Sequence, residues 1–293
     1  MSVGERDPHT GRETTGHEWN GIKELNTPVP KVVWIALLVT FLFSLVYWVL
    51  MPAWPLGVTY TRGLLGLDDG KVVAAKVEAA KAARAPWASR IMAADFAEIQ
   101  RDPALMNIVR EAGHPLFADN CAVCHGTRGT GGKGFPNLAA NTWLWGGDAD
   151  AIAETIRVGI NSGHEETRVS QMMAFGRDGM LNRKEVLAVV TYVQALSNPA
   201  IRAETDAETL ELGGTVFADN CAACHGEDAR GIPEMGAPDL ADDVWIYGGD
   251  RQTIFETVWN GRQGHMPHWE GRLGELERKI LTLYVLDLAG ARP

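Results

Sequence analysis

Two stretches of ten residues, one hundred positions apart, are almost identical. The run FADNCAVCHG occupies 117–126 and FADNCAACHG occupies 217–226, and the two differ only at Val123 and Ala223. Each contains Cys-x-x-Cys-His, in which two closely spaced thiols can form thioethers to one porphyrin while the histidine supplies an axial nitrogen to its iron. The repeat therefore predicts a chain that carries two covalently bound haem c groups.

The chain has four cysteines, and all of them belong to these motifs: Cys121, Cys124, Cys221 and Cys224. A redox dithiol or a four-cysteine zinc site would also use Cys-x-x-Cys pairs. A zinc site gives no reason for a histidine after each pair, and a thioredoxin-like motif needs strand patterns that are nearly absent here. The motifs thus predict haem attachment, with His125 and His225 as axial iron ligands.

A sixth iron ligand must come from outside each motif, and it decides whether the site is closed for electron transfer or open for ligands. Methionines stand shortly before the closing helix of each repeat, in QMMAFG at 171–176 and in HMPH at 265–268. This repeated position predicts Met172 for the first haem and Met266 for the second. The alternatives are Met173 or His164 at the first haem and His265 or His268 at the second.

Residues 32–50 form an apolar run of nineteen without a charge. At helical rise they span roughly 28 Å, close to the hydrocarbon thickness of a bilayer. The lead of thirty-one residues is too long for a cleaved signal peptide. Lys23 and Lys31 precede the run and no basic residue follows it before Arg62, so we expect a cytoplasmic amino terminus. Haem c is attached outside the cytoplasm, which places the haem domains in the periplasm.

Helical periodicity and the lack of alternating runs predict an all-α fold with one amino-terminal transmembrane helix and two cytochrome c-like domains. The expected segments are a mostly irregular cytoplasmic tail (1–31), a transmembrane anchor (32–51), a linker with helical segments (52–103), and haem domains at 104–199 and 200–293.

Within each haem domain we expect a helix before the cysteines (104–119 and 207–219) and a closing helix (183–196 and 273–288). Asp148 and Asp250 follow matched Gly-Gly pairs and should cap the next helix. Asn182 with Glu185 predicts a capping box.

The formal net charge of −10 is concentrated in residues 200–293, which hold 8 Lys and Arg against 17 Asp and Glu. The sign disfavours nucleic acid as a partner. A one-sided field of this kind steers a basic protein toward the acidic domain. We therefore expect the carboxy-terminal domain to be the docking face for a basic donor cytochrome c.

The run WNGIKELNTP at 19–28, the apolar span, the two CxxCHG motifs, QMMAFG and GHMPHW occur together in this order. This arrangement resembles the dihaem subunit of cbb3-type cytochrome c oxidases over nearly the whole chain. One departure is that the family has Met-Pro where this chain has Met172-Met173.

The resemblance implies a bacterial inner-membrane protein that relays electrons within a respiratory complex. Its implied partners are a haem-copper catalytic subunit, a monohaem cytochrome c subunit, a donor cytochrome c and membrane lipid. Oxygen reduction and proton pumping would belong to the complex, because this span has no acidic or basic group to relay a proton. The alternatives are a membrane-anchored dihaem cytochrome that serves another periplasmic redox enzyme and a dihaem peroxidase.

Overall fold

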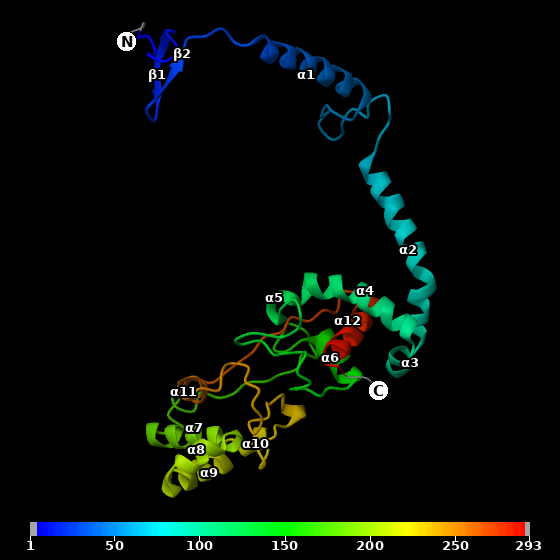
Figure 1. Ribbon diagram of the computed structural model, residues 1–293. Coiled ribbons are helices and arrows are strands. Elements are labelled where there is room, and N and C mark those ends of the chain that lie inside the picture. Colours follow the sequence, from blue (N-terminus) through cyan, green and yellow to red (C-terminus); the bar gives the residue numbers. More distant parts are fainter. Residues whose placement is uncertain (1–4, 291–293) are drawn as a thin grey trace. The chain divides into compact units, whose positions relative to one another are not determined.

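The computed structural model describes residues 5–290 (Figure 1). Residues 1–4 and 291–293, at the ends of the first and last predicted segments, lie outside the described part. The chain divides into two compact units, with the boundary between Ala83 and Arg84. Helices dominate both units, as the all-α prediction requires.

The first unit begins with a β-hairpin, which corrects the prediction of a mostly irregular tail. Strand β1 (Thr14–Trp19) pairs antiparallel with β2 (Ile22–Leu25). The turn residues Asn20 and Gly21 have φ values of 49° and 86°, the left-handed region that Asn-Gly adopts in two-residue hairpin turns. The Asn-Gly pair was thus the signal in the sequence for this hairpin.

Helix α1 (Lys31–Leu50) coincides with the predicted transmembrane anchor. It is the one helix of residues 5–290 that is long and apolar enough to cross a bilayer, and none of its side chains is buried by protein. Helix α2 (Asp69–Ala93), in the predicted linker, continues through Pro86. Alanine-rich sequence on both sides supplies the helix propensity that offsets the missing N–H of the proline.

The second unit contains the predicted helices of both repeats, with bounds that differ by at most two residues from expectation. Helix α3 (Phe96–Arg101) ends the linker, and the first repeat forms α4 (Pro103–Asn120), α5 (Ala122–His125), α6 (Ala149–Val158) and α7 (Arg183–Ser197). After α8 (Pro199–Glu204), the second repeat forms α9 (Ala207–Asn220), α10 (Ala222–His225), the short 3-10 helix η1 (Pro233–Met235), α11 (Arg251–Asn260) and α12 (Glu275–Leu288).

The predicted helix caps are present. The Asp148 carboxylate accepts a hydrogen bond from the backbone N–H of Ala151 at 2.9 Å, and Asp250 accepts one from Thr253 at 3.0 Å. Asn182 and Glu185 form the reciprocal capping box at the start of α7. Each cap fixes the residue at which its helix begins.

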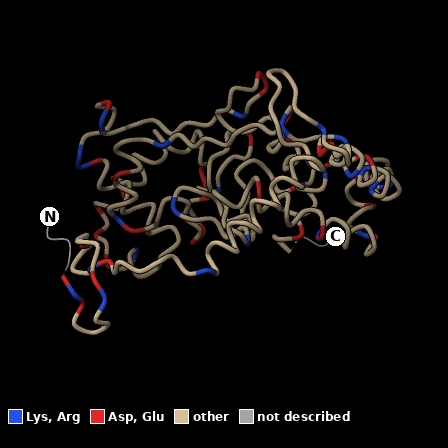
Figure 2. Tube along the Cα trace, turned by 90° about the horizontal axis from the view of Figure 1, so that it is seen from above, with Lys and Arg blue, Asp and Glu red and all other residues tan. Residues whose placement is uncertain are grey.

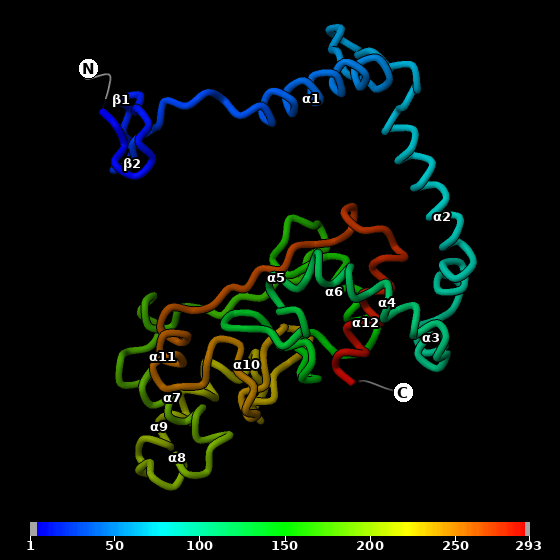
Figure 3. Tube along the Cα trace, turned by 45° about the horizontal axis from the view of Figure 1, so that its top comes forward, coloured from blue at the N-terminus to red at the C-terminus, as the bar shows by residue number. Residues whose placement is uncertain are grey.

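The closing helices are exchanged between the two repeats. Helix α12, from the second repeat, packs against α4 and α6 of the first, whereas α7 packs against α9 and α11 of the second. Figures 1 and 3 both show α12 beside α4, and α7 grouped with α9 and α11. The packing therefore does not follow the order of the repeats along the chain.

Matching contacts make the two exchanged helix pairs equivalent. In one pair Gly113 of α4 lies directly under Tyr284 of α12, whose ring is 5.5 Å from that of Phe117. In the other pair Gly213 of α9 lies under Tyr192 of α7, 5.6 Å from Phe217. Glycine is needed at both crossings because a Cβ atom would stand only 2.8 Å from Tyr284 or 2.5 Å from the Ala188 carbonyl of α7.

Two hydrophobic cores result, and each contains side chains from both repeats. The first core joins Ile99, Val109 and Phe117 to Ile280, Leu281 and Leu283. The second core joins Val186, Val189, Val190 and Val193 to Val216 and Phe217. These residues are at most 6 % exposed. The burial of apolar side chains between the exchanged helices therefore stabilises the association of the two repeats.

Candidate functional site

One continuous cavity of about 830 Å³ lies between the two cores. Short helices α5 and α10 present both motifs to it, and their residues line it together with the two predicted methionine ligands: Cys121, Cys124, His125, Met172, Cys221, Cys224, His225 and Met266. The cavity wall is largely apolar, with Trp143, Trp245 and Leu138 among its residues. Its size, its apolar wall and the thiols at its edge fit covalently attached porphyrins.

The two motif histidines are held in the same way. Nδ1 of His125 lies 3.1 Å from the Pro136 carbonyl oxygen, and Nδ1 of His225 lies 3.0 Å from that of Pro238. A carbonyl only accepts, so Nδ1 donates and Nε2 remains available with its lone pair for iron. Burial lowers the pKa of both imidazoles, against the opposing effect of these hydrogen bonds, and so favours the neutral form that binds metal.

The first cysteine of each motif is a buried thiol. Desolvation, followed by repulsion from the second cysteine, raises the pKa of Cys121 and of Cys221 to about 11. The protonated thiol is a poor nucleophile. Cys121 and Cys221 are therefore not activated for thiol–disulfide exchange in this folded form.

The two methionines pack in the opposite order to the expected pairing. Met266 packs against the first core, beside the His125 motif, and Met172 packs against the second core, beside the His225 motif. The reason is the helix exchange, because each methionine loop leads into a closing helix that packs against the other repeat. The order of motifs along the sequence contains no sign of this crossing.

Of the alternatives at these sites, Met173 is 50 % exposed, unlike the partly buried Met172. His164 is engaged elsewhere, since its Nε2 lies 2.7 Å from Glu270 and its Nδ1 accepts the N–H of Glu166. His265 is exposed, and its Nδ1 lies 2.9 Å from the carbonyl oxygen of Asn161, which leaves Nε2 free as in the two motif histidines. Exposure therefore counts against Met173 and His265, and the contact with Glu270 counts against His164.

His268, the remaining alternative, is half-buried beside the ring of His164, with 5.6 Å between the ring centroids. It is not among the residues that line the cavity, whereas Met266 is.

Sequence reasoning overlooked Arg168. Its guanidinium stacks over Trp145 at 5.0 Å, and one Nη donates to the Ala151 carbonyl. Its Nε is buried without a hydrogen-bond partner among the described residues. Such an orphaned cationic donor beside a cavity-lining tryptophan fits an acidic group of a bound cofactor, for example a haem propionate.

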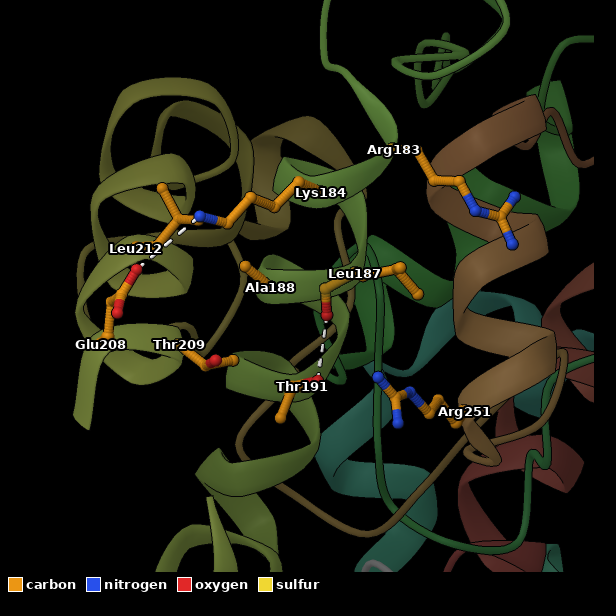
Figure 4. A pocket seen from close by; sticks show the side chains of 9 residues that line it. All are labelled: Arg183, Lys184, Leu187, Ala188, Thr191, Glu208, Thr209, Leu212 and Arg251. Atoms are coloured by element: carbon orange, nitrogen blue, oxygen red, sulfur yellow. Dashed lines mark hydrogen bonds and ion pairs between the residues drawn. The ribbon is translucent and has the colours of Figure 1, made fainter. Parts of the chain in front are cut away.

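A second hollow, of about 400 Å³, lies between α7, α9 and α11 (Figure 4). Figure 4 shows Arg183 and Arg251 on one side and the ion pair of Lys184 with Glu208 on the other. Its lining contains no cysteine or histidine. The hollow therefore has none of the iron-ligand chemistry of the large cavity.

Three family models match successive parts of the chain. The N-terminal domain of cytochrome oxidase-cbb3, FixP, matches residues 11–58, cytochrome c matches 110–197, and cytochrome C oxidase, cbb3-type, subunit III matches 208–285. The subunit FixP of the cbb3-type cytochrome c oxidase of Bradyrhizobium sp. is 44% identical over 288 residues, which is 98% of both chains. The chain belongs to the FixP/CcoP family.

Other members of the FixP/CcoP family show the same extent of similarity. The CcoP subunit of Azospirillum brasilense is 44% identical and covers 100% of both chains, and that of Cereibacter sphaeroides is 42% identical over 94% of both. The resemblance seen in the sequence is thus confirmed. Cytochrome c domains carry covalently bound haem c, and α1 makes this member of the family a membrane-anchored protein.

Proposed function

We propose that this FixP/CcoP protein is the dihaem electron-relay subunit of a cbb3-type cytochrome c oxidase. The observation that carries the proposal is the single cavity that both CxxCH motifs and both loop methionines line. Bound haem would supply one-electron chemistry by cycling its iron between ferric and ferrous states. Two sites in one cavity form a short path for electrons between them.

The ligand sets follow the packing of the two cores. Cys121 and Cys124 would attach the first haem, with His125 and Met266 on its iron. Cys221 and Cys224 would attach the second haem, with His225 and Met172 on its iron. Methionine at both sixth positions closes the irons to external ligands, which suits electron transfer and disfavours peroxidase chemistry.

The proposed partners are the haem-copper catalytic subunit and the monohaem cytochrome c subunit of the oxidase, with a donor cytochrome c as the source of electrons. Lys23 and Lys31 on the amino-terminal side of α1 support a cytoplasmic amino terminus and periplasmic haem domains. Protease added to intact spheroplasts should then cleave the linker after α1. Cleavage restricted to inverted vesicles would reverse this orientation.

Copurification tests the proposed function. An affinity-tagged chain extracted in mild detergent should bring down a copper-containing oxidase core and carry two haem c per chain. The complex should show oxygen-dependent oxidation of cytochrome c. Recovery with a periplasmic dehydrogenase, or with no copper, would instead support a donor to another enzyme. Cyanide binding at one of the two haem c groups in the resting chain would support a peroxidase.

A further inference from the structure

The two methionine loops cross each other in an antiparallel arrangement. Ile160 and Met266 exchange two backbone hydrogen bonds of 2.9 Å, and Met172 and Arg262 exchange two of 2.8 and 3.1 Å. Each proposed ligand is thus bonded through its own backbone to the other loop. These backbone pairs lie at the two ends of the crossing. Between them, residues 161–171 of one loop face residues 263–265 of the other, and side chains connect the two loops there.

Asn161 occupies this middle position. Its Nδ2 donates to the carbonyl oxygens of Ser170 at 2.8 Å and Gly264 at 2.7 Å, and its Oδ1 accepts the N–H of Ser170 at 3.2 Å. Its own carbonyl oxygen lies 2.9 Å from Nδ1 of His265. The amide side chain therefore uses both of its N–H donors and its oxygen in one place.

The bonded residues stand in matching positions with respect to the ligands. Ser170 is two residues before Met172, and Gly264 is two residues before Met266. One amide group thus fixes both loops at the same distance from their methionines. The backbone of Asn161 also has φ of 48°, a conformation that asparagine tolerates better than most residues, so both its side chain and its backbone suit this position.

We propose that Asn161 is a positioning residue that couples the two sixth-ligand loops, so that Met172 and Met266 are held on their irons together. The proposal rests on the proposed function, in which these methionines are the ligands. It predicts that loss of one side chain, which touches neither iron, weakens methionine coordination at both. A residue with a merely structural role would lower stability without this double effect.

The experiment uses the full-length holoprotein and the near-infrared methionine–iron charge-transfer absorption of its oxidised form. Met172→Ala and Met266→Ala should each remove about half of this absorption, because each deletes one of two ligands. If neither variant changes it, the proposed ligation is wrong, and Asn161 is not yet in question. If both variants lose part of the band, the two losses give the share of the absorption that each haem contributes.

Asn161→Ala and Asn161→Gly should then lose more than half of the band, and both reduction potentials should fall. Asn161→Gly relieves the left-handed backbone, so a loss shared by both variants reports the missing amide. Asn182→Ala is the matched control, since Asn182 also bonds backbone N–H groups through its side chain, at the start of α7. It should lower Tm and keep the full band.

If Asn161→Ala yields too little holoprotein, Asn161→Asp tests the coupling of the two loops instead. It keeps the shape and one acceptor oxygen but loses both Nδ2 donations to Ser170 and Gly264. A loss greater than half supports the coupling. A full band, or a loss confined to one haem, would overturn it.

Discussion

Arg157 links the two repeats at the level of single side chains. Its guanidinium contacts Glu154 at 2.8 Å within α6, Glu166 at 2.5 Å, and Glu270 at 3.0 Å in the loop that follows Met266. The same Glu270 carboxylate binds His164. This network fixes the end of the second methionine loop on the first repeat.

Arg157→Ala should therefore destabilise the protein in a pH-dependent manner. The hydrogen bond from Arg157 lowers the pKa of Glu154, and bonds from His164 and then Arg157 lower that of Glu270. A carboxylate with a lowered folded pKa stabilises the fold above its unfolded pKa of about 4.3, and the benefit is lost as pH falls through the folded value.

The measurement is Tm by circular dichroism at neutral pH and at about pH 3, below the unfolded pKa of glutamate. The difference in Tm between parent and Arg157→Ala should be largest at neutral pH and shrink in acid. Arg177→Ala is the control, because Arg177 pairs only with its exposed neighbour Asp178 among the described residues. An Arg157→Ala effect that is equal at both pH values would show that the ion pairs do not stabilise the fold.

The helix pairs across the exchange depend on close approach at glycine. In α4 a Cβ on Gly113 would stand 2.8 Å from Cβ of Tyr284 in α12, closer than such atoms pack. Gly113→Ala should thus cost about 1–3 kcal/mol of unfolding free energy, although alanine is the better helix former.

Gly70→Ala in α2 gives the matched comparison. Its Cβ would meet only one oxygen of the Asp68 carboxylate, at 3.2 Å, and no atom of another helix. Denaturant unfolding should show a loss for Gly113→Ala and no loss for Gly70→Ala. Equal stability of Gly113→Ala and parent would mean that α4 and α12 are not packed this closely.

The sequence predicts most of the helices, but it does not predict against which helices the two closing helices pack. Caps such as Asp148 and Asp250, and the helices they begin, follow from local chemistry and could be predicted. The hairpin also has a local signal in the sequence, the Asn20-Gly21 pair. The exchange of α7 and α12 had none, because both closing helices present similar apolar faces and either could cover either haem motif. Hence the loops that contain Met172 and Met266 could be found in the sequence, whereas the core against which each methionine packs could not.

Charge is arranged unequally over the whole molecule. Residues 227–243, which follow the second motif, contain six acidic residues and one basic residue, while the matching segment 127–143 contains two basic residues and no acidic one. Figure 2 shows acidic and basic residues otherwise interspersed along the chain. We therefore expect a basic donor to dock on this loop, rather than on the acidic domain as a whole.

Reduction by a basic donor cytochrome c should then slow as salt rises, because screening weakens long-range steering. Neutralising Glu227, Asp228 and Glu234 together should lower the second-order rate at low salt and flatten its salt dependence. Stopped-flow absorbance measures both. The control set neutralises three exposed acids of the first repeat that do not line the cavity, namely Glu111, Asp150 and Glu165. Rates that are indifferent to salt would remove the docking hypothesis.

The crossing of the ligand loops is the central claim, and methyl NMR tests it in the two-haem protein. In reduced protein with labelled methionine methyl groups, the Met266 methyl, assigned with Met266→Ala, should show nuclear Overhauser contacts to the haem attached at Cys121 and Cys124. The Met172 methyl should contact the haem at Cys221 and Cys224. Contacts of each methionine with the haem of its own repeat would contradict the exchanged fold.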